Sequence, residues 1–209
     1  MEQYYLAIDI GASSGRHILG HMEDGKMVLE EIYRFPNGMT EENGQRCWNV
    51  KALFRAILEG MKKCKKAGKS PVSMGIDTWA VDFVLLDKKN KMLGDAVGYR
   101  DSRTAGMDEK VYEIIPEEKL YERTGIQKPE ILEHAETMLM IPEYFNYLLT
   151  GEKASEYTNA TTTQLVSPET KDWDYELIEM LGYPKQIFQK IKKPGTVLGN
   201  LTKEIQKEV

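Results

Sequence analysis

The 209 residues of this chain are enough for one large domain or two small ones with a substantial buried core. Its 41% hydrophobic and 29% charged residues are typical of a soluble globular protein, and its net charge of −5 argues against nucleic acid as the main partner. No apolar run approaches a membrane span, no signal peptide is recognised, and Cys47 and Cys64 have no metal-ligand spacing, so we expect a reduced, cytoplasmic protein.

The first predicted element is a short apolar strand over residues 4–8, followed by the turn Asp9-Ile-Gly-Ala-Ser-Ser-Gly-Arg16 and a second strand over residues 17–21. Two glycines and two serines predict a tight turn whose backbone N–H groups and hydroxyls point at one spot, which attracts anions. Because the carboxylate of Asp9 would repel a bare phosphate, the expected third component is a divalent cation such as Mg²⁺. The turn therefore favours phosphate with magnesium, and an ordinary Gly-Ser hairpin with a surface acid is an equal alternative.

A third strand is predicted over residues 26–35, and it ends at Pro36-Asn37-Gly38. Three consecutive strands joined by tight turns predict an antiparallel meander at the start of the sheet. A helix follows, with Asn49 as its predicted N-cap and apolar residues at helical spacing up to Met61. Lysines at its end, before Gly68, either attract a nucleotide or stabilise the helix C-terminus, and the second interpretation is the commoner case.

The next predicted strands cover residues 73–77 and 82–87, and together with the preceding helix they indicate a mixed, three-layer α/β arrangement. From residue 102 onward the pattern becomes helical. The predicted helices cover residues 104–115, 117–124 and 130–149, the last interrupted by Pro142 and closed by Thr150-Gly151. One more short helix is predicted between Trp173 and Leu181.

A second stretch with chemical potential is Gly75-Ile-Asp-Thr-Trp-Ala-Val-Asp82, which lies where one strand ends and the next begins. Trp79 and Ala80 should face the mouth of the sheet, where an indole can lie against a sugar. Carboxylates of this stretch, Asp82 among them, or its backbone amides could bind the sugar hydroxyls. The alternative is a tight corner in which Trp79 fills the core.

A third stretch, residues 98–104, places Arg100, Asp101 and Arg103 beside Tyr99. Charged groups next to an aromatic ring suit the recognition of a polyol. The alternative is a salt-bridged helix start capped by Asp101 or Ser102.

These stretches belong to a set of six segments that occur in order along nearly the whole chain. They are Asp9–Arg16, Gly75–Phe83, Tyr99–Thr104, Tyr121–Gln127, Glu156–Leu165 and Pro194–Gly199. Together they closely resemble the rhamnulokinases, which belong to the FGGY carbohydrate kinases within the actin-like ATPase superfamily. The resemblance implies a ribonuclease-H-like α/β domain over residues 1–209, with a mixed sheet, an initial antiparallel meander and flanking helices. This would be the first of two domains, with ATP and the sugar meeting in the cleft between them.

The resemblance also implies roles for individual residues. Asp9 would lie near Mg²⁺. The residues expected to contact the ATP phosphates are Ala12, Ser13, Ser14, Gly15 and Arg16. The residues expected to contact the substrate are Trp79, Ala80, Asp82, Tyr99 and Arg100. The family usually has glycine at the position of Ala80, and a small side chain there should still let the backbone approach the sugar.

Two departures from the family pattern stand out. A family member continues into a second domain that carries the general base and the adenine pocket, and neither is found in this chain. The family also has an additional stretch at the junction of Gln127 and Lys128, which this sequence either lacks or omits.

The resulting hypothesis is the N-terminal domain of an L-rhamnulose kinase of rhamnose catabolism, which transfers the γ-phosphate of ATP to a primary hydroxyl and is inactive alone. No nucleic acid or membrane partner is expected. The alternatives are a kinase for another ketose or polyol, a non-catalytic sugar- or phosphate-binding module, and another actin-like ATPase.

Overall fold

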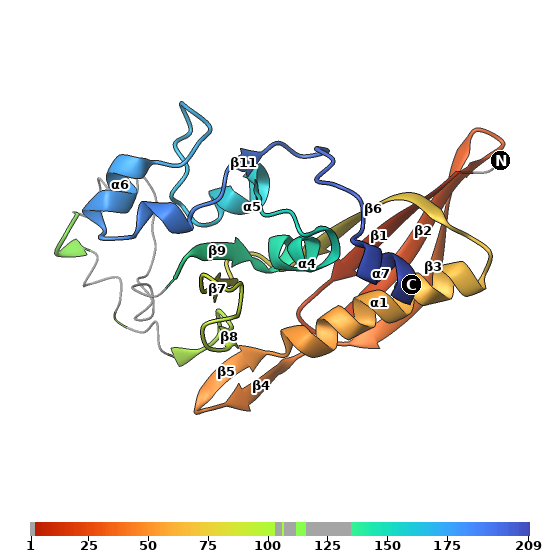
Figure 1. The fold of residues 1–209 in the computed structure, drawn as a ribbon, viewed down its shortest axis with the longest axis horizontal. Coiled ribbons are helices and arrows are strands. Elements are labelled where there is room, and N and C mark those ends of the chain that lie inside the picture. Colours follow the sequence, from red (N-terminus) through yellow and green to blue (C-terminus); the bar gives the residue numbers. More distant parts are fainter. Residues whose placement is uncertain (1–2, 103–105, 107–111, 116–134) are drawn as a thin grey trace.

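The fold is organised around a four-stranded mixed sheet. In the computed structural model, which describes residues 3–102, 106, 112–115 and 135–209, the strand order of this sheet is β3-β2-β1-β6 (Figure 1). The four strands are β1 (Tyr4–Ile10), β2 (Ser14–Glu23), β3 (Lys26–Pro36) and β6 (Pro71–Thr78). Strands β1, β2 and β3 pair antiparallel and β6 pairs parallel to β1, so the predicted mixed sheet with an initial meander is confirmed.

Tight turns set the register of the hairpins. Between β2 and β3, Asp24 and Gly25 have φ angles of 47° and 75°. The hairpin formed by β4 (Met39–Glu42) and β5 (Gln45–Trp48) turns at Asn43 and Gly44, with φ angles of 53° and 76°. Two successive residues with positive φ match the right-handed twist of paired strands, and Asn-Gly and Asp-Gly are the sequences that adopt this geometry most readily. Strand β5 also pairs with β8 (Ala96–Val97).

Three helices cover one face of the main sheet. Helix α1 (Val50–Lys66) begins at the predicted N-cap, because the side chain of Asn49 accepts a hydrogen bond of 2.9 Å from the N–H of Ala52. Helices α4 (Ile141–Thr150) and α7 (Lys203–Glu208) lie on the same side, and α1 and α4 meet at the stacked rings of Phe54 and Phe145 (Figure 1).

Lys63, Lys65 and Lys66 lie in the last turn of α1, as the helix-end interpretation expects, and lysines of this helix also contact other elements. Lys62 forms a 3.0 Å ion pair with Glu208, and the ammonium group of Lys65 donates to the carbonyl oxygen of Val209 at 2.7 Å. The Nζ atom of Lys63 lies 4.2 Å from the centroid of the Tyr33 ring. These cations therefore hold α7 and β3 against α1.

In the described part of the chain, the other face of the main sheet is open. Side chains on alternate positions of β1 point there: Tyr5 is 49% exposed and Ala7 is exposed, whereas Leu6 and Ile8 are buried under the helices. The expected three-layer arrangement is therefore not observed among the described residues, where sheet and helices form two layers. No described helix is both long and apolar enough to cross a membrane.

A second hydrophobic core lies beside the first. A two-stranded antiparallel sheet of β7 (Phe83–Leu86) and β9 (Thr137–Met140) lies between the two cores: Leu85 and Met138 belong to the second core, and Val84, Leu86 and Leu139 belong to the first. Around the second core lie β10 (Ser155–Glu156), α5 (Tyr157–Thr161), α6 (Tyr175–Met180), the 3₁₀ helix η3 (Lys185–Ile187) and β11 (Ile191–Lys192). Helix α6 falls within the predicted 173–181 segment, and the side chain of Asp174 caps it by accepting from the N–H of Leu177.

The predicted helix over residues 130–149 is wrong in its central part. All four residues of β9 are buried and pair with β7, so strand pairing overrides helical periodicity here. Helix α4 begins only at Ile141, with Pro142 in its first turn, where a missing N–H costs nothing. It ends as predicted at Gly151, which has a φ of 79°. The predicted 117–124 helix, most of the 104–115 helix and the Gln127–Lys128 junction lie outside the described residues.

Candidate functional site

The first candidate element is the turn between β1 and β2. The N–H of Gly11 donates to the carbonyl oxygen of Ser14 at 2.9 Å, which closes the turn. Asn37, which follows β3, holds it from the side: its backbone N–H donates to Ser13 O at 3.0 Å and its Nδ2 donates to Gly11 O at 2.8 Å. In the sequence, Asn37 shows no signal beyond the end of a strand. Because neighbouring backbone fixes the turn, its geometry does not depend on a ligand.

Gly15 has a steric reason to be glycine. A Cβ built on it would lie 2.1 Å from the ring of Phe35, which is buried in the first core. Ala12 is half-buried and packs against the same core, whereas Ser13 is exposed. The turn therefore presents one edge to the interior and one hydroxyl-bearing edge to solvent.

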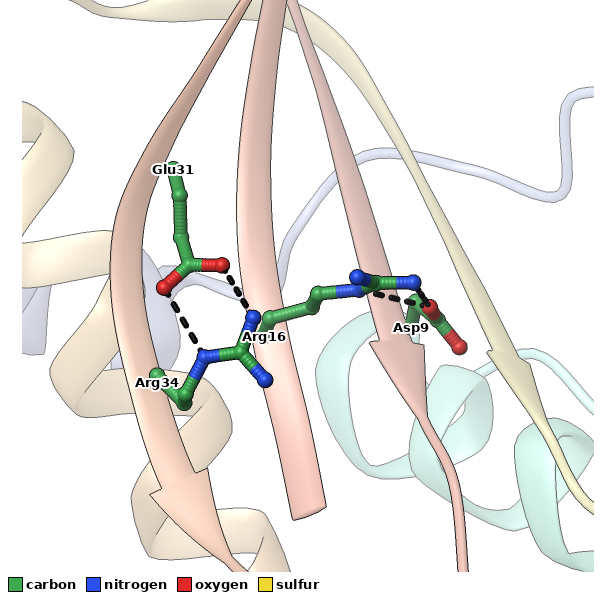
Figure 2. A network of polar contacts seen from close by, with 4 residues as sticks. All are labelled: Asp9, Arg16, Glu31 and Arg34. Carbon is green, nitrogen blue, oxygen red and sulfur yellow. Dashed lines mark hydrogen bonds and ion pairs between the residues drawn. The ribbon is translucent and has the colours of Figure 1, made fainter.

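A row of charged side chains crosses the open face of the sheet beside this turn (Figure 2). The Nε and Nη2 atoms of Arg16 lie 2.9 and 2.7 Å from Oδ2 of Asp9, its direct cross-strand neighbour. On the other side of Arg16 is Arg34, which bonds Glu31 and thereby lowers the pKa of that carboxyl.

This ion pair departs from the expectation that the carboxylate of Asp9 is available to a cation. Both side chains are more than two-fifths exposed, at 42% for Asp9 and 44% for Arg16. An exposed ion pair contributes about 0–1 kcal/mol, so a ligand of either charge could separate the two groups at little cost.

A second carboxylate lies next to Asp9. Strands β1 and β6 run parallel, and their register places Asp9 directly opposite Asp77, whose side chain is exposed. Mg²⁺ in proteins is usually held by one or two carboxylates and keeps several waters, so this pair fits that ion. Within the described ranges, no group of three or more His, Cys, Asp or Glu side chains could form an all-protein cage. The signal that could have revealed Asp77 is the presence of an aspartate near the end of both strands.

The second candidate element, residues 78–82, follows β6 and is organised by a buried carboxylate. Asp82 is only 6% exposed, and its Oδ2 accepts a hydrogen bond from Trp48 Nε1 at 2.6 Å and from Trp79 Nε1 at 2.8 Å. The two indole rings lie 3.8 Å apart with an interplanar angle of 30°. Trp79 is half-buried and packs against the first core, as the alternative interpretation expected.

The residues between Trp79 and Asp82 form a strained, exposed turn. Ala80 and Val81 are exposed, and Val81 has a φ of 69°. A β-branched residue in this left-handed region is a genuine outlier, and such outliers concentrate at ligand-binding sites.

The third candidate element, residues 98–101, is fastened to β5. The N–H of Gly98 donates to Arg46 O at 2.8 Å, and the N–H of Arg46 donates to Oδ2 of Asp101 at 2.8 Å. Tyr99 is 41% exposed, and the guanidinium carbon of Arg100 lies 5.3 Å from the centroid of its ring. Tyr99 and Arg100, the two predicted substrate residues of this element, are therefore exposed to solvent, and hydrogen bonds to β5 hold the backbone that carries them.

The structure brings the three elements together at one edge of the main sheet. The first turn follows β1 and residues 79–81 follow β6, whose last residue, Thr78, pairs with Ile10. The third element is joined to the second through Trp48, because a Cβ on Gly98 would lie 2.8 Å from its Nε1 atom. Sequence reasoning missed Trp48, since it precedes a helix cap and carries no motif of its own.

Comparison with known proteins gives a consistent result. The model of the FGGY family of carbohydrate kinases, N-terminal domain, matches residues 4–128 and 126–209. A rhamnulokinase of Halalkalibacterium halodurans is 54% identical over 99% of this chain and 47% of its own length. A rhamnulokinase of Oceanobacillus iheyensis is 49% identical over 100% of this chain and 48% of its own length. The chain thus spans about half the length of these relatives.

The fold is shared with solved carbohydrate kinases. A gluconate kinase of Lactobacillus acidophilus superposes with a TM-score of 0.86 at 20% identity, over 100% of this chain and 45% of its own. A xylulose kinase of the same organism gives a TM-score of 0.85 at 20% identity, over 99% of this chain and 45% of its own. At this identity the likeness concerns the fold alone, and it confirms the predicted fold class.

Proposed function

Because this chain belongs to the FGGY family of carbohydrate kinases, we propose that it is the N-terminal domain of an L-rhamnulose kinase. The enzyme transfers the γ-phosphate of ATP to L-rhamnulose and forms L-rhamnulose 1-phosphate. The observation that carries this proposal is the 54% and 49% identity to rhamnulokinases over essentially the whole chain. The general base and the adenine pocket are then expected in a C-terminal half, which this chain does not contain.

In this proposal, the first turn binds the ATP phosphates through Ala12–Arg16. Its backbone is fixed by Asn37, and Ser13 and Arg16 are exposed at its surface. A guanidinium group donates several hydrogen bonds in a planar fork that matches phosphate oxygens. Arg16 would exchange its exposed pairing with Asp9 for a phosphate, and Asp9 would gain a cation in return.

Asp9, with Asp77 beside it, is the proposed holder of Mg²⁺. When bound with ATP, this ion neutralises charge on the phosphates during transfer, a reaction that depends almost entirely on positioning and electrostatic stabilisation. The contribution of the chain itself is to keep two carboxylates adjacent at the edge where the phosphate turn also lies.

The proposed sugar contacts come from the second and third elements. Trp79 and Ala80 of the second element and Tyr99 and Arg100 of the third are the proposed contacts. The exposure of Ala80, Tyr99 and Arg100 supports contact with a ligand, and an aromatic ring against a ring face with polar groups at the hydroxyls is a usual sugar-binding arrangement. The buried carboxylate of Asp82 fits an indirect role better than direct contact.

The test is a coupled assay of ADP formation by the full-length protein on a panel of ketoses. We expect the highest kcat/KM with L-rhamnulose and the lowest rates with L-fuculose and D-xylulose. A clear preference for either of the other two sugars would overturn the substrate assignment and leave the kinase assignment intact.

A second candidate is a sugar- or phosphate-binding module without activity, and turnover by the full-length protein in this assay would exclude it. The isolated 209-residue chain tests where the adenine pocket lies. The kinase proposal predicts no turnover by the isolated chain and only weak ATP binding in calorimetric titration. Tight ATP binding by the isolated chain would contradict the placement of the adenine pocket in the other half.

A further inference from the structure

We infer that Trp48 is a positioning residue that, through the carboxylate of Asp82, sets the spacing of the two sugar-binding elements and thereby the affinity for the ketose. This inference rests on the proposed function. It assigns a role to a residue that touches neither substrate nor nucleotide, because Trp48 is only 3% exposed.

Trp48 and Trp79 are linked through one oxygen atom of Asp82. Both indole N–H groups, from Trp48 and Trp79, donate to Oδ2 of Asp82, at 2.6 and 2.8 Å. Hydrogen bonds to a buried charge are roughly twice as strong as neutral ones, and removing one donor leaves the charge undercompensated. The two rings also pack on each other, with their centroids 3.8 Å apart and their planes tilted by 30°. The position of the Trp79 ring is therefore determined by Trp48 as much as by its own backbone.

The same anchor holds the strained turn. Val81 has a φ of 69° and directly precedes Asp82. On the backbone side, the carbonyl oxygen of Asp82 accepts from the N–H of Ile141 at 3.2 Å. A non-glycine residue in this region is strained, and the strain persists only where the surroundings fix the backbone. If the side-chain anchor is loosened, the turn can relax, and the exposed Ala80 and Val81 move with it.

Trp48 also limits how closely the third element approaches. It does so together with Met39, because a Cβ on Gly98 would lie 2.8 Å from Nε1 of Trp48 and 2.5 Å from Cε of Met39. Two residues before Trp48 on the same strand, Arg46 holds Gly98 and Asp101 through the two backbone hydrogen bonds described above. Strand β5 thus contacts both elements: Arg46 hydrogen-bonds the third element, and Trp48 hydrogen-bonds Asp82 of the second.

The phosphate turn is fixed by other groups. Its backbone is held by Asn37 and by the close packing of Gly15 on Phe35, without Trp48. A change at Trp48 should therefore act on the sugar and leave the nucleotide unaffected, and this separation is what distinguishes positioning of the sugar elements from a general loss of structure.

The experiment compares Trp48→Phe with Trp173→Phe in the full-length protein. Trp173 is a matched control: it is 4% exposed, its Nε1 donates one hydrogen bond of 2.7 Å to Gln189 O, and its ring packs on Phe188 in the second core. Both variants keep an aromatic ring and lose one indole N–H. Trp48→Phe should raise the KM for the ketose about tenfold or more, since small misplacements at a site have effects of that size, and leave the KM for ATP within about twofold. Trp173→Phe should leave both constants within about twofold.

A second variant and a spectroscopic measurement guard against a folding defect. Asp82→Asn keeps the size and one acceptor oxygen of the side chain but loses the charge, and it should raise the ketose KM in the same direction as Trp48→Phe. Far-ultraviolet circular dichroism should show the exciton coupling of the two indoles, whose ring centroids lie 3.8 Å apart, and this signal should disappear in Trp48→Phe and persist in Trp173→Phe.

Failure of the positioning role of Trp48 can be distinguished from failure of the proposed kinase function. If the unsubstituted protein phosphorylates the ketose and Trp48→Phe raises the ketose KM no more than Trp173→Phe does, the inference is overturned and the proposed function stands. If both KM values rise together in Trp48→Phe, the residue is merely structural and the inference is again overturned. If the unsubstituted protein phosphorylates no ketose, the proposed function is overturned, and the positioning role with it.

Discussion

The imidazole of His17, on β2, lies beneath helix α1 with its Nε2 atom 3.1 Å from the carbonyl oxygen of Ile57. The ring is completely buried, and a Cβ on Gly60 of the helix would lie 2.3 Å from it, so the glycine makes room for the histidine. Burial lowers the pKa of His17 from 6.5 to about 4, although the bond to Ile57 opposes this shift. The neutral ring, with Nε2–H donating, is therefore part of the folded state.

The first prediction is that His17 makes the chain less stable as the pH falls. Because the folded pKa lies below the unfolded one, the stabilisation is present above pH 6.5 and is lost as the pH falls towards 4. A shift of this size corresponds to about 3 kcal/mol of unfolding free energy. Urea unfolding of His17→Leu should show a correspondingly smaller loss of stability between pH 6.5 and 4. An unchanged pH dependence in that variant would contradict the buried neutral histidine.

The second prediction is that Glu143 makes the chain less stable as the pH rises, opposite to the effect of His17. Its carboxyl is buried in the first turn of α4 and accepts from the N–H of Glu156 at 3.1 Å and from Asn159 Nδ2 at 3.0 Å. Burial raises its pKa from 4.5 to about 7. Since the folded pKa is the higher one, stability is greatest below pH 4.5 and falls by about 3 kcal/mol as the pH rises through 7.

Replacement of this residue, Glu143→Gln, removes the titrating group and keeps an acceptor oxygen. Relative to the unsubstituted chain, the variant should gain stability as the pH rises from 4.5 to above 7, measured by urea unfolding. Between pH 4.5 and 6.5, His17 and Glu143 change the free energy of unfolding in opposite directions. The contribution of each group is therefore obtained only from the difference in unfolding free energy between the unsubstituted chain and the variant. Parallel curves for Glu143→Gln and the unsubstituted chain would show that the carboxyl is ionised in the folded state.

The third prediction tests the phosphate role of Arg16 against a neighbouring arginine. Arg16→Ala should raise the KM for ATP of the full-length enzyme about tenfold or more, since charge-assisted bonds to phosphate are lost. Its stability should change by less than about 1 kcal/mol, because the pair with Asp9 is exposed. Arg34→Ala is the control: Arg34 is the cross-strand neighbour of Arg16 and is also in an exposed ion pair, with Glu31. Equal KM values for ATP in the two variants would remove Arg16 from the nucleotide site.

The fourth prediction concerns the packing under the phosphate turn. Gly15→Ala places a methyl group 2.1 Å from the Phe35 ring and should destabilise the chain by about 1–3 kcal/mol through overpacking. Gly75→Ala is the matched change, because Gly75 lies in the same sheet with open space around its Cβ position, and it should cause no loss. Thermal unfolding of both variants provides the measurement. If Gly15→Ala is as stable as Gly75→Ala, the Phe35 ring moves aside without cost, and its packing on Gly15 does not fix the turn.

Local patterns sufficed for much of this fold. The meander, the cap at Asn49, the end of α4 at Gly151 and the short helix after Asp174 all depend on residues close in sequence. Turn residues with positive φ and side-chain caps act over four or five positions, so the sequence is enough to reveal them.

Strand β9 shows where local patterns fail. Residues 137–140 were expected to be helical, but they pair with β7, which lies more than fifty positions earlier in the chain. The absence of helices on the open face of the sheet among the described residues, with Tyr5 half exposed there, is equally a matter of which elements pack together. Contacts between distant segments decide such features, and propensity over a short window carries no information about them.

For the candidate site, sequence patterns alone led to the prediction that the Gly-Ser turn, the loop around Trp79 and the Tyr99-Arg100 pair carry the chemistry. The positions of these residues relative to one another depend on the tertiary structure. Tertiary folding placed Asp77 beside Asp9, because neighbouring parallel strands bring together residues far apart in the chain. It also withdrew the carboxylate of Asp82 from solvent by fixing it to Trp48, thirty-four positions away, since a buried charge is stable only where donors from elsewhere in the chain converge on it.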